Sequence, residues 1–494
     1  MMRCSLELWI WIILLLGLTL TGLTGCSGDG PQVCTTSEDC NDNNECTEDT
    51  CDVTTGNCDH APVADETQCR VGVCQAGQCE PIASVFPCTE EGIREAIGEG
   101  GGPHAFSCNG PTTVVTQEEI VIENDVILNG LDNLTIDGND DHRVFSVSSE
   151  VTVELFRMSI TGGHGDDGGG IRNNGRLWLT SSSVSGNTAD YNGGGIYNDW
   201  ASESILVDST VSGNSAGNGA GIMNYRTLTL SGSSVSGNTA MWDGGGIWSS
   251  SDTQVALIDS MVSGNTSEWA GGGVHSGGRL MVTNSSVSGN TAVGGGGGIH
   301  CIDLTMTNST VSGNTTDASG GGITHWGTST VTNSTVSGNV AAETGGGILN
   351  WWNLTLINTT LSGNTAATGG NIGGGNNVML SNTLIDGDCE LENGYEPVTL
   401  GGNLESPGDT CGLDPSIDEI NVTPAELNLG ALQDNGGPTL THLPGPESAA
   451  IDIIDPEDCV DADGLRLTKD QRGEMRPQGR KCDVGAVEVV SGAP

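Results

Sequence analysis

The chain has 494 residues, with 78 glycines, 63 acidic residues and only 15 lysines and arginines, so its formal net charge is −48. This charge argues against nucleic acid or an anionic membrane face as a partner, and the length excludes one ordinary compact domain. Glycine at this abundance without a Gly-X-Y period excludes collagen and indicates a repeat protein or disorder.

The first residues are typical of a bacterial lipoprotein signal peptide. An apolar run over 8–20 is short for a membrane-spanning helix, and Leu23-Thr24-Gly25-Cys26 follows it at once. This tetrapeptide resembles the lipobox, in which the cysteine is acylated and the chain is cleaved in front of it. We therefore expect residues 1–25 to be removed and acyl chains on Cys26 to anchor the protein in the outer membrane. The alternative is an ordinary signal sequence with an incidental cysteine.

After a linker over 26–33, eight cysteines crowd into residues 34–80 among polar and acidic residues. So polar a segment folds only when it is cross-linked, and four disulfides are the natural cross-links. Zinc is the alternative, although paired Cys-x-x-Cys knuckles are absent. The stretch from Cys40 to Cys58 resembles a Cys-rich module of surface proteins from myxobacteria-like organisms, which implies a stalk or interaction module. The pairing of the eight cysteines stays open.

Residues 81–112 are expected to cap a solenoid. The stretch from Cys88 to Ile97 is typical of a short helix with Ile93, Ala96 and Ile97 on one face, suited to covering an open end. Seven cysteines lie beyond the module, and their number suggests three pairs and one free thiol. The expected pairs are Cys88–Cys108, Cys389–Cys411 and Cys459–Cys482, with Cys301 left free.

One pattern recurs from Gly168 to about Asn376 in steps of 24 to 27 residues. Gly-Gly-Gly-Ile or a close variant opens each unit, and Ser-Gly-Asn closes it. The closing asparagines are Asn187, Asn214, Asn238, Asn265, Asn290, Asn314, Asn339 and Asn364.

Each unit holds three apolar patches of strand length and shows no helical periodicity. A unit of this size with three strands predicts one coil of a right-handed parallel β-helix, which we expect over 113–386. Equivalent residues of successive coils then stack about 4.8 Å apart, so the asparagines form a ladder of hydrogen-bonded amides. Glycine supplies the positive φ that tight corners need. The fold class is therefore all-β.

The C-terminal residues 387–494 are expected to form a capping region. They contain Leu429-Gly430-Ala431-Leu432-Gln433-Asp434-Asn435-Gly436-Gly437-Pro438-Thr439, Asp470-Gln471-Arg472-Gly473 and Cys482-Asp483-Val484-Gly485-Ala486-Val487-Glu488. With the opening Arg94-Glu95-Ala96-Ile97, these motifs resemble bacterial parallel β-helix surface proteins of the choice-of-anchor Q domain type. The resemblance implies surface display through an interchangeable anchor, here the lipid at Cys26.

Many parallel β-helices cleave acidic polysaccharides, so a polysaccharide lyase or glycoside hydrolase is the alternative function. His164, Asp166 and Asp167 echo pieces of a polygalacturonase site and also fit one calcium-binding nonapeptide. A weak calcium site at Asp166 and Asp167 is left open. A lyase needs a basic residue, and the regular coils hold few. We expect no catalytic residue, no cofactor and no metal.

Alternation along the strand after the glycines defines two columns. The inward column is Asn173, Asn198, Asn224, Ser249, Ser276, Cys301, His325 and Asn350, which makes Cys301 an inert buried thiol. The outward column is Arg172, Tyr197, Met223, Trp248, His275, His300, Thr324 and Leu349.

The outward rings form the candidate ligand face. Tyr197, Trp248, His275 and His300 suit a sugar polymer or a partner protein, and Tyr191, Trp242 and Trp269 are expected at its rim. The alternative is that the rings shield a glycine-rich backbone. The sequence therefore predicts a monomeric, non-enzymatic surface lipoprotein, adhesive or structural.

Overall fold

The computed structural model describes residues 84–489, apart from 376 and 392–394, together with five short strands between residues 47 and 81. The chain divides into two compact units, residues 1–82 and 83–494. Cys26 and the residues expected to form a signal peptide lie outside the described residues. No described helix is long and apolar enough to cross a membrane.

The described strands of the first unit form two small antiparallel sheets. β1 (Thr47–Asp52) pairs with β2 (Asn57–Pro62), which sets Cys51 opposite Cys58. β4 (Gly72–Gln75) pairs with β3 (Gln68–Cys69) and with β5 (Gln78–Pro81), which sets Cys74 opposite Cys79.

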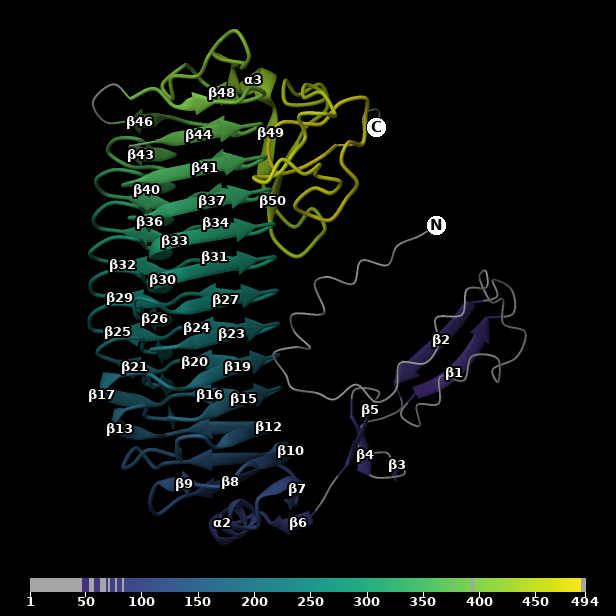
Figure 1. Cartoon of the computed structure of the whole chain (residues 1–494), viewed down its shortest axis with the longest axis vertical. Helices are drawn as coiled ribbons and strands as arrows, with labels where there is room; N and C mark the ends of the chain where they lie inside the picture. The colour runs from purple at the N-terminus through teal and green to yellow at the C-terminus, as the bar shows by residue number, and fades with distance from the viewer. Residues whose placement is uncertain are drawn as a thin grey trace. The chain divides into compact units, whose positions relative to one another are not determined.

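The second unit is a right-handed parallel β-helix, as predicted, whose coils stack into long strand columns (Figure 1). The first column follows the glycines and holds β9 (Ile120–Ile122), β11 (Phe145–Val147), β14 (Ile171–Asn173), β18 (Ile196–Asn198), β22 (Ile222–Asn224), β26 (Ile247–Ser249), the starts of β30 (Val274–Thr283) and β33 (Ile299–Thr307), β36 (Ile323–His325), β40 (Ile348–Asn350), β43 (Ile372–Gly374) and β46 (Cys389–Leu391).

The second column holds β6 (Ser84–Pro87), β7 (Gly101–Ser107), the starts of β10 (Val126–Asp137) and β12 (Thr152–Thr161), β15 (Arg176–Thr180), β19 (Glu203–Val207), β23 (Thr227–Ser231), β27 (Gln254–Ile258), the ends of β30 and β33, β37 (Thr328–Thr332), β41 (Asn353–Ile357), β44 (Val378–Ser381) and β47 (Val398–Thr399).

The third column holds β8 (Thr112–Val115), the ends of β10 and β12, β16 (Ser183–Ser185), β20 (Thr210–Ser212), β24 (Ser234–Ser236), β28 (Met261–Ser263), β31 (Ser286–Ser288), β34 (Thr310–Ser312), β38 (Thr335–Ser337), β42 (Thr360–Ser362), β45 (Leu384–Asp386) and β48 (Leu404–Ser406).

A fourth, short column differs from the three strands expected in each coil. It holds β13 (His164–Asp167), β17 (Thr188–Asn192), β21 (Ser215–Ala216), β25 (Thr239–Ala240), β29 (Thr266–Ser267), β32 (Thr291–Ala292), β35 (Thr315–Thr316) and β39 (Val340–Ala341). Most of these strands have two residues, and that is too short for the alternation that reveals a strand in a sequence.

The predicted asparagine ladder runs through the interior. Oδ1 of Asn265 accepts hydrogen bonds from the backbone N (3.0 Å) and from Nδ2 (2.9 Å) of Asn238, one coil earlier. Nδ2 of Asn265 donates in turn to the carbonyl of Val235 and to Oδ1 of Asn290, both at 3.0 Å. Because these side chains are buried and each bond joins adjacent coils, the ladder fixes the coil register. A second ladder, of serines, was not foreseen from the sequence. The backbone N of Ser182 donates to Oγ of Ser209 in the next coil, and that hydroxyl donates back to the carbonyl of Leu179.

The three glycines between the fourth and first columns have different roles. The first adopts a positive φ, as expected at a corner, and in Gly271 this angle is 66°. The second must be glycine because there is no room for a side chain. A Cβ on Gly272 would lie 2.4 Å from the carbonyl oxygen of Thr291 in the next coil, so no larger residue fits.

Helix α2 (Glu90–Glu99) covers the N-terminal end of the solenoid, as predicted (Figure 1). Thr89 caps the helix by accepting a hydrogen bond from the backbone N of Gly92. The face with Ile93, Ala96 and Ile97 joins the core cluster, and the Cys88–Cys108 disulfide ties the helix to the first coil.

The coils continue through β48, beyond the boundary expected at 386, and the rest of the chain does more than cap an end. It contains α3 (Pro424–Leu427), β49 (Leu429–Gln433) and β50 (Thr441–Pro444) and lies along the side of the last coils (Figure 1). Gln471 bridges two coils, accepting a hydrogen bond from Thr335 (2.7 Å) and donating to Thr310 (2.9 Å). The third column is therefore covered from β34 onward.

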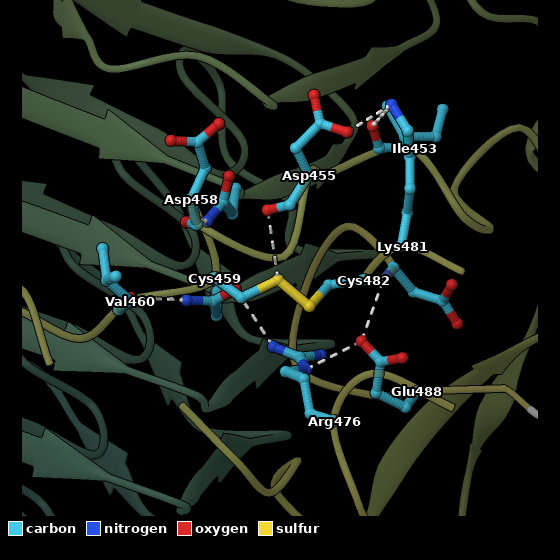
Figure 2. Close-up of a disulfide and its surroundings, with 12 residues drawn as sticks. Ile453, Asp455, Asp458, Cys459, Val460, Arg476, Lys481, Cys482 and Glu488 are labelled. Atoms are coloured by element: carbon cyan, nitrogen blue, oxygen red, sulfur yellow. Dashed lines mark hydrogen bonds and ion pairs between the residues drawn. A yellow bond between two sulfur atoms is a disulfide. The ribbon is translucent and has the colours of Figure 1, made fainter. Parts of the chain in front are cut away.

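The predicted disulfides Cys389–Cys411 and Cys459–Cys482 are both present. Beside the second, Nε of Arg476 forms an ion pair with Glu488 at 2.9 Å, and both side chains are fully buried (Figure 2). Nη1 of Arg476 donates to Oδ1 of Asn358, a residue of the solenoid, at 3.0 Å. This arginine therefore fastens the C-terminal region to the β-helix.

Candidate functional site

The strand register places Tyr197, Trp248, His275 and His300 in one outward column, in the order derived from the sequence. Tyr197 pairs with Met223, Met223 with Trp248, Trp248 with His275, and His275 with His300. The inward neighbours, among them Cys301 and His325, are fully buried. Alternation in these three-residue strands thus presents one line of side chains outward over successive coils.

The rings of this column belong to a longer ladder. Trp248 stacks on His275 with centroids 5.9 Å apart, and His275 stacks on His300 at 5.0 Å, both nearly parallel. At one end Tyr225 contacts Trp248 (5.6 Å), and at the other Trp326 contacts His300 (6.4 Å). The ring centroids of Trp200 and Tyr225 are 4.5 Å apart, and those of Trp351 and Trp326 are 4.9 Å apart. We call this set, from Trp200 to Trp351 with Tyr197, the aromatic ladder.

The expectation of an exposed flat face is wrong for the column itself. The side chain of Tyr197 is buried, and those of Trp248, His275 and His300 are half-buried. Rings that stack at the coil spacing cover one another's faces, so the interior of the ladder presents ring edges to solvent.

The exposed rings lie beside the column. Four follow the first-column strands, namely Trp200 (63% exposed), Trp326 (51%), Trp351 (39%) and Trp352 (56%). Three precede the glycines, namely Tyr191 (56%), Trp242 (42%) and Trp269 (62%). Sequence reasoning missed five rings because they lie in turns after the strand, although each comes one or two residues after an inward column residue. These are Trp200, Tyr225, Trp326, Trp351 and Trp352.

The exposed rings beside the column are not all equivalent. A Cβ on Gly217 would lie 2.7 Å from the ring of Trp242, so Trp242 covers glycine backbone, as the shielding alternative requires. Among the described residues neither Trp269 nor Trp352 makes a contact with another ring, so no other ring covers these exposed side chains. We define the aromatic surface as the ladder together with Trp352, which follows Trp351 directly in the chain.

Burial lowers the pKa of His275 and of His300 to about 4, and the neighbouring imidazole contributes at His300. Both rings are therefore neutral at pH 7. Nε2 of His300 accepts a hydrogen bond from Nε1 of Trp326 at 3.2 Å, which assigns its proton to Nδ1. Nδ1 of His275 lies 3.7 Å from Asp243, whose pKa burial raises. At the ladder's start the guanidinium of Arg172 lies over the ring of Tyr197.

Cys301 and His325 lie side by side in the inward column. Burial raises the pKa of the Cys301 thiol, so the reactive thiolate is disfavoured, in agreement with the inert thiol expected from the register. Burial also lowers the pKa of His325 to about 4. The pair lacks access for a substrate because both side chains are enclosed.

The acidic corner expected near residue 166 takes part in contacts between coils. Oδ1 of Asp167 accepts a hydrogen bond from Asn192 at 2.8 Å, and His164 lies 3.2 Å from Asp190. Within the described part of the chain, no three His, Cys, Asp or Glu side chains are grouped so that they could hold a metal ion.

Two repeat families match short parts of the chain. A Chlamydia polymorphic membrane protein repeat matches residues 181–199, which span one Ser-Gly-Asn and one Gly-Gly-Gly-Ile motif. A Dictyostelium (slime mold) repeat matches residues 39–63. No curated protein matches the chain in sequence.

Among solved structures, the crystal structure of pectate lyase Pel9A is similar at 12% identity, over 82% of this chain and 96% of that one. The TM-score is 0.33, and a likeness of that size carries no conclusion about activity.

Proposed function

We propose that the protein is a non-enzymatic cell-surface lipoprotein that binds an extended neutral glycan along the aromatic surface. The observation that supports this most is the set of exposed tryptophans at the two ends of the aromatic ladder, with Trp200 at one end and Trp326, Trp351 and Trp352 at the other. Exposed aromatic groups that gather on one face mark binding sites, since scattered single ones need no such explanation. A sugar ring presents a C–H face that packs on an open indole.

An extended ligand fits this arrangement better than a compact one. The first-column strands rise about 4.8 Å per coil, so rings in successive coils repeat along a straight line. The half-buried ladder between the exposed rings holds Trp326 and Trp351 in place through stacking and through the Trp326–His300 hydrogen bond. Rings that are fixed before binding lose little conformational entropy when a ligand arrives.

Charge favours a neutral polymer. With a net charge of −48, the protein repels polyanions such as uronic-acid polymers. The aromatic surface adds Asp243 beside His275, and both histidines are uncharged at pH 7.

Surface display is proposed from the sequence. The lipobox-like Leu23–Cys26 supplies a lipid anchor, the resemblance to choice-of-anchor Q proteins is consistent with display, and the Cys-rich module serves as a stalk. The three disulfides of the β-helix unit support an oxidising compartment.

The test is a polysaccharide panel with the purified chain from residue 26 onward. Xylan, glucomannan, galactomannan and β-glucan are the neutral polymers, and polygalacturonate and alginate the acidic ones. In affinity electrophoresis we expect at least one neutral polymer to retard the protein. We expect no polymer of the panel to release unsaturated or reducing products. Cleavage of an acidic polymer would establish the lyase or hydrolase alternative. If the protein bound only to another surface protein and to none of the polymers, a protein partner would replace the glycan as the ligand.

A further inference from the structure

We propose a second ligand site on this protein, a small cavity around Arg157 that binds a single neutral sugar unit. The cavity has a volume of about 260 Å³ and lies where the second strand column bends into the third, in the opening coils. Its wall includes Pro111, Asp132, Thr135, Arg157, Ser183 and Thr210. None of these residues belongs to the aromatic surface, so the site does not rest on the function proposed above.

Arg157 occupies a backbone position that disfavours it. The residue at this bend adopts a left-handed conformation in each coil, and it is Ser181, Asp208, Asp259 and Asn284 in four later coils. Asn, Asp and Gly tolerate that conformation best, yet Arg157 adopts it with φ 53°. Because the bend recurs in every coil, the repeat imposes this conformation, and the contacts of the Arg157 side chain must offset its cost.

The opposing wall is shaped around the same arginine. Leu131 and Asp132 are consecutive left-handed residues with φ 52° and 58°, and Oδ1 of Asn129 accepts a hydrogen bond from the backbone N of Leu131 at 2.9 Å. This loop brings Asp132 to Arg157, whose Nε donates to Oδ2 of Asp132 at 2.7 Å and whose Nη2 contacts the same oxygen. The ion pair holds the guanidinium in one orientation.

One donor of the guanidinium remains unused. Nη1 of Arg157 is buried and has no hydrogen-bond partner among the described residues, and the whole residue is only 9% exposed. A buried donor without an acceptor is unfavourable. Because Nη1 is itself covered, a ligand oxygen reaches it when the wall opens slightly, and the new hydrogen bond would offset that movement. Asp132 offers an acceptor on the same wall, which gives a donor and an acceptor side by side, as a pair of neighbouring sugar hydroxyls requires.

The rest of the lining fits the same class of ligand. Thr135, Ser159, Ser183 and Thr210 contribute hydroxyl groups, and Ser183 already donates to Ser159 at 3.1 Å. Pro111 supplies an apolar surface for the C–H face of a ring. The lining holds two carboxylates, Asp132 and Asp208, and one guanidinium, so its net charge is negative and a charged uronate is disfavoured. The volume is below the usual range for drug-sized ligands and suits one ring.

The test uses the chain from residue 26 with the methyl glycosides of glucose, galactose, mannose and xylose, and with methyl galacturonate as the charged probe. Binding is measured by calorimetry and by the shift of the Arg157 Nε–H resonance. We expect at least one neutral glycoside to bind in the millimolar range, as ligand efficiency allows for so small a molecule, and the uronate to bind more weakly.

Matched variants localise the binding. Ser183→Ala should weaken it about fivefold, the effect of one lost hydrogen bond, whereas Ser286→Ala, at the same position of a later coil, should not change it. Arg157→Lys should abolish it, and Trp352→Ala should leave it intact even if the aromatic surface proves inactive. If Arg157→Lys does not fold, Ser183→Ala and Ser286→Ala still decide. The proposal is overturned if no neutral glycoside moves the Arg157 signal, if the uronate binds best, or if Ser183→Ala binds like the parent.

Discussion

Nε1 of Trp326 donates a hydrogen bond to Nε2 of His300, 3.2 Å away, and so joins a turn residue of one coil to a strand residue of the coil before it. The bond requires a neutral imidazole with its proton on Nδ1. Protonation of His300 would convert the acceptor into a donor and would set two N–H groups against each other. The geometry of the exposed Trp326 is thereby linked to the charge state of a half-buried histidine.

The free energy of unfolding should decrease as the pH is lowered from about 6.5 to about 4. The pKa of His275 and of His300 is about 4 in the folded chain because of burial, against 6.5 for a free imidazole. Between pH 6.5 and 4 the unfolded chain binds protons that the folded chain does not, so the free energy of unfolding decreases as the pH falls. Each ring contributes up to about 3 kcal/mol over that window.

Urea unfolding of the parent and of the His275→Phe, His300→Phe double variant at pH 7, 5.5 and 4.5 checks this. His325 and His442 titrate in the same direction in both proteins, so only the difference is informative. The double variant should lose less stability on acidification than the parent. Equal slopes for double variant and parent would rule out this linkage.

The asparagine ladder should be costly to interrupt. Asn265→Ala removes the acceptor for two N–H groups of Asn238 and leaves the Val235 carbonyl and Oδ1 of Asn290 short of a donor, all in the interior. Because buried unsatisfied groups cost about 1–3 kcal/mol each, with partial relaxation, we expect a loss of about 3–5 kcal/mol in thermal or chemical unfolding.

Thr266→Ala is the control, since Thr266 is the exposed neighbour of Asn265 and should change stability by less than about 0.5 kcal/mol. A cost for Asn265→Ala as small as that of the control would show that the ladder is not what fixes the coils.

Thiol chemistry should distinguish Cys301 from the other cysteines. It is the free cysteine among the described residues, it is buried, and burial raises its pKa. The native chain from residue 26, prepared with Cys26→Ser, should therefore not react with a thiol reagent. After denaturation without reduction about one thiol should titrate, and several would contradict four disulfides in the Cys-rich module.

Anchoring depends on one residue. If Cys26 is acylated, Cys26→Ser should move the protein from the membrane to the soluble fraction of its host, because acyl chains supply the membrane affinity. Mass spectrometry of the wild-type N-terminus gives the direct readout. An unmodified N-terminus downstream of Cys26 would sink the lipoprotein assignment.

The sequence predicts the β-helix and its asparagine ladder well because one physical rule, the stacking of equal positions, acts in every coil. Once the apolar residues after the glycines, Ile247, Val274 and Ile299, are aligned, the outward line through Trp248, His275 and His300 follows from alternation alone. The partners Tyr225, Trp326 and Trp351 do not follow, because they lie in turns of variable length after the strand. Exposure was misjudged for a related reason, since stacked rings bury one another.

Other features depend on contacts between segments far apart in the chain. The pairing of Arg157 with Asp132 arises from a loop that departs from the repeat. The hydrogen bonds of Gln471 with Thr310 and Thr335 join the last part of the chain to the middle of the β-helix. Neither has a periodic signal that could be read in advance.

The central claim is that open indole faces on the aromatic surface bind a neutral glycan. The most direct measurement is the affinity of Trp352→Ala for the neutral polymer that retards the parent most, beside its melting temperature and beside Met261→Ala, an exposed apolar residue of the third column. Loss of one aromatic anchor of about 2 kcal/mol predicts affinity about thirtyfold weaker, with a melting temperature like the parent's and unchanged binding by Met261→Ala. Unchanged affinity with a markedly lower melting temperature would show instead that the ring shields the coils and binds nothing.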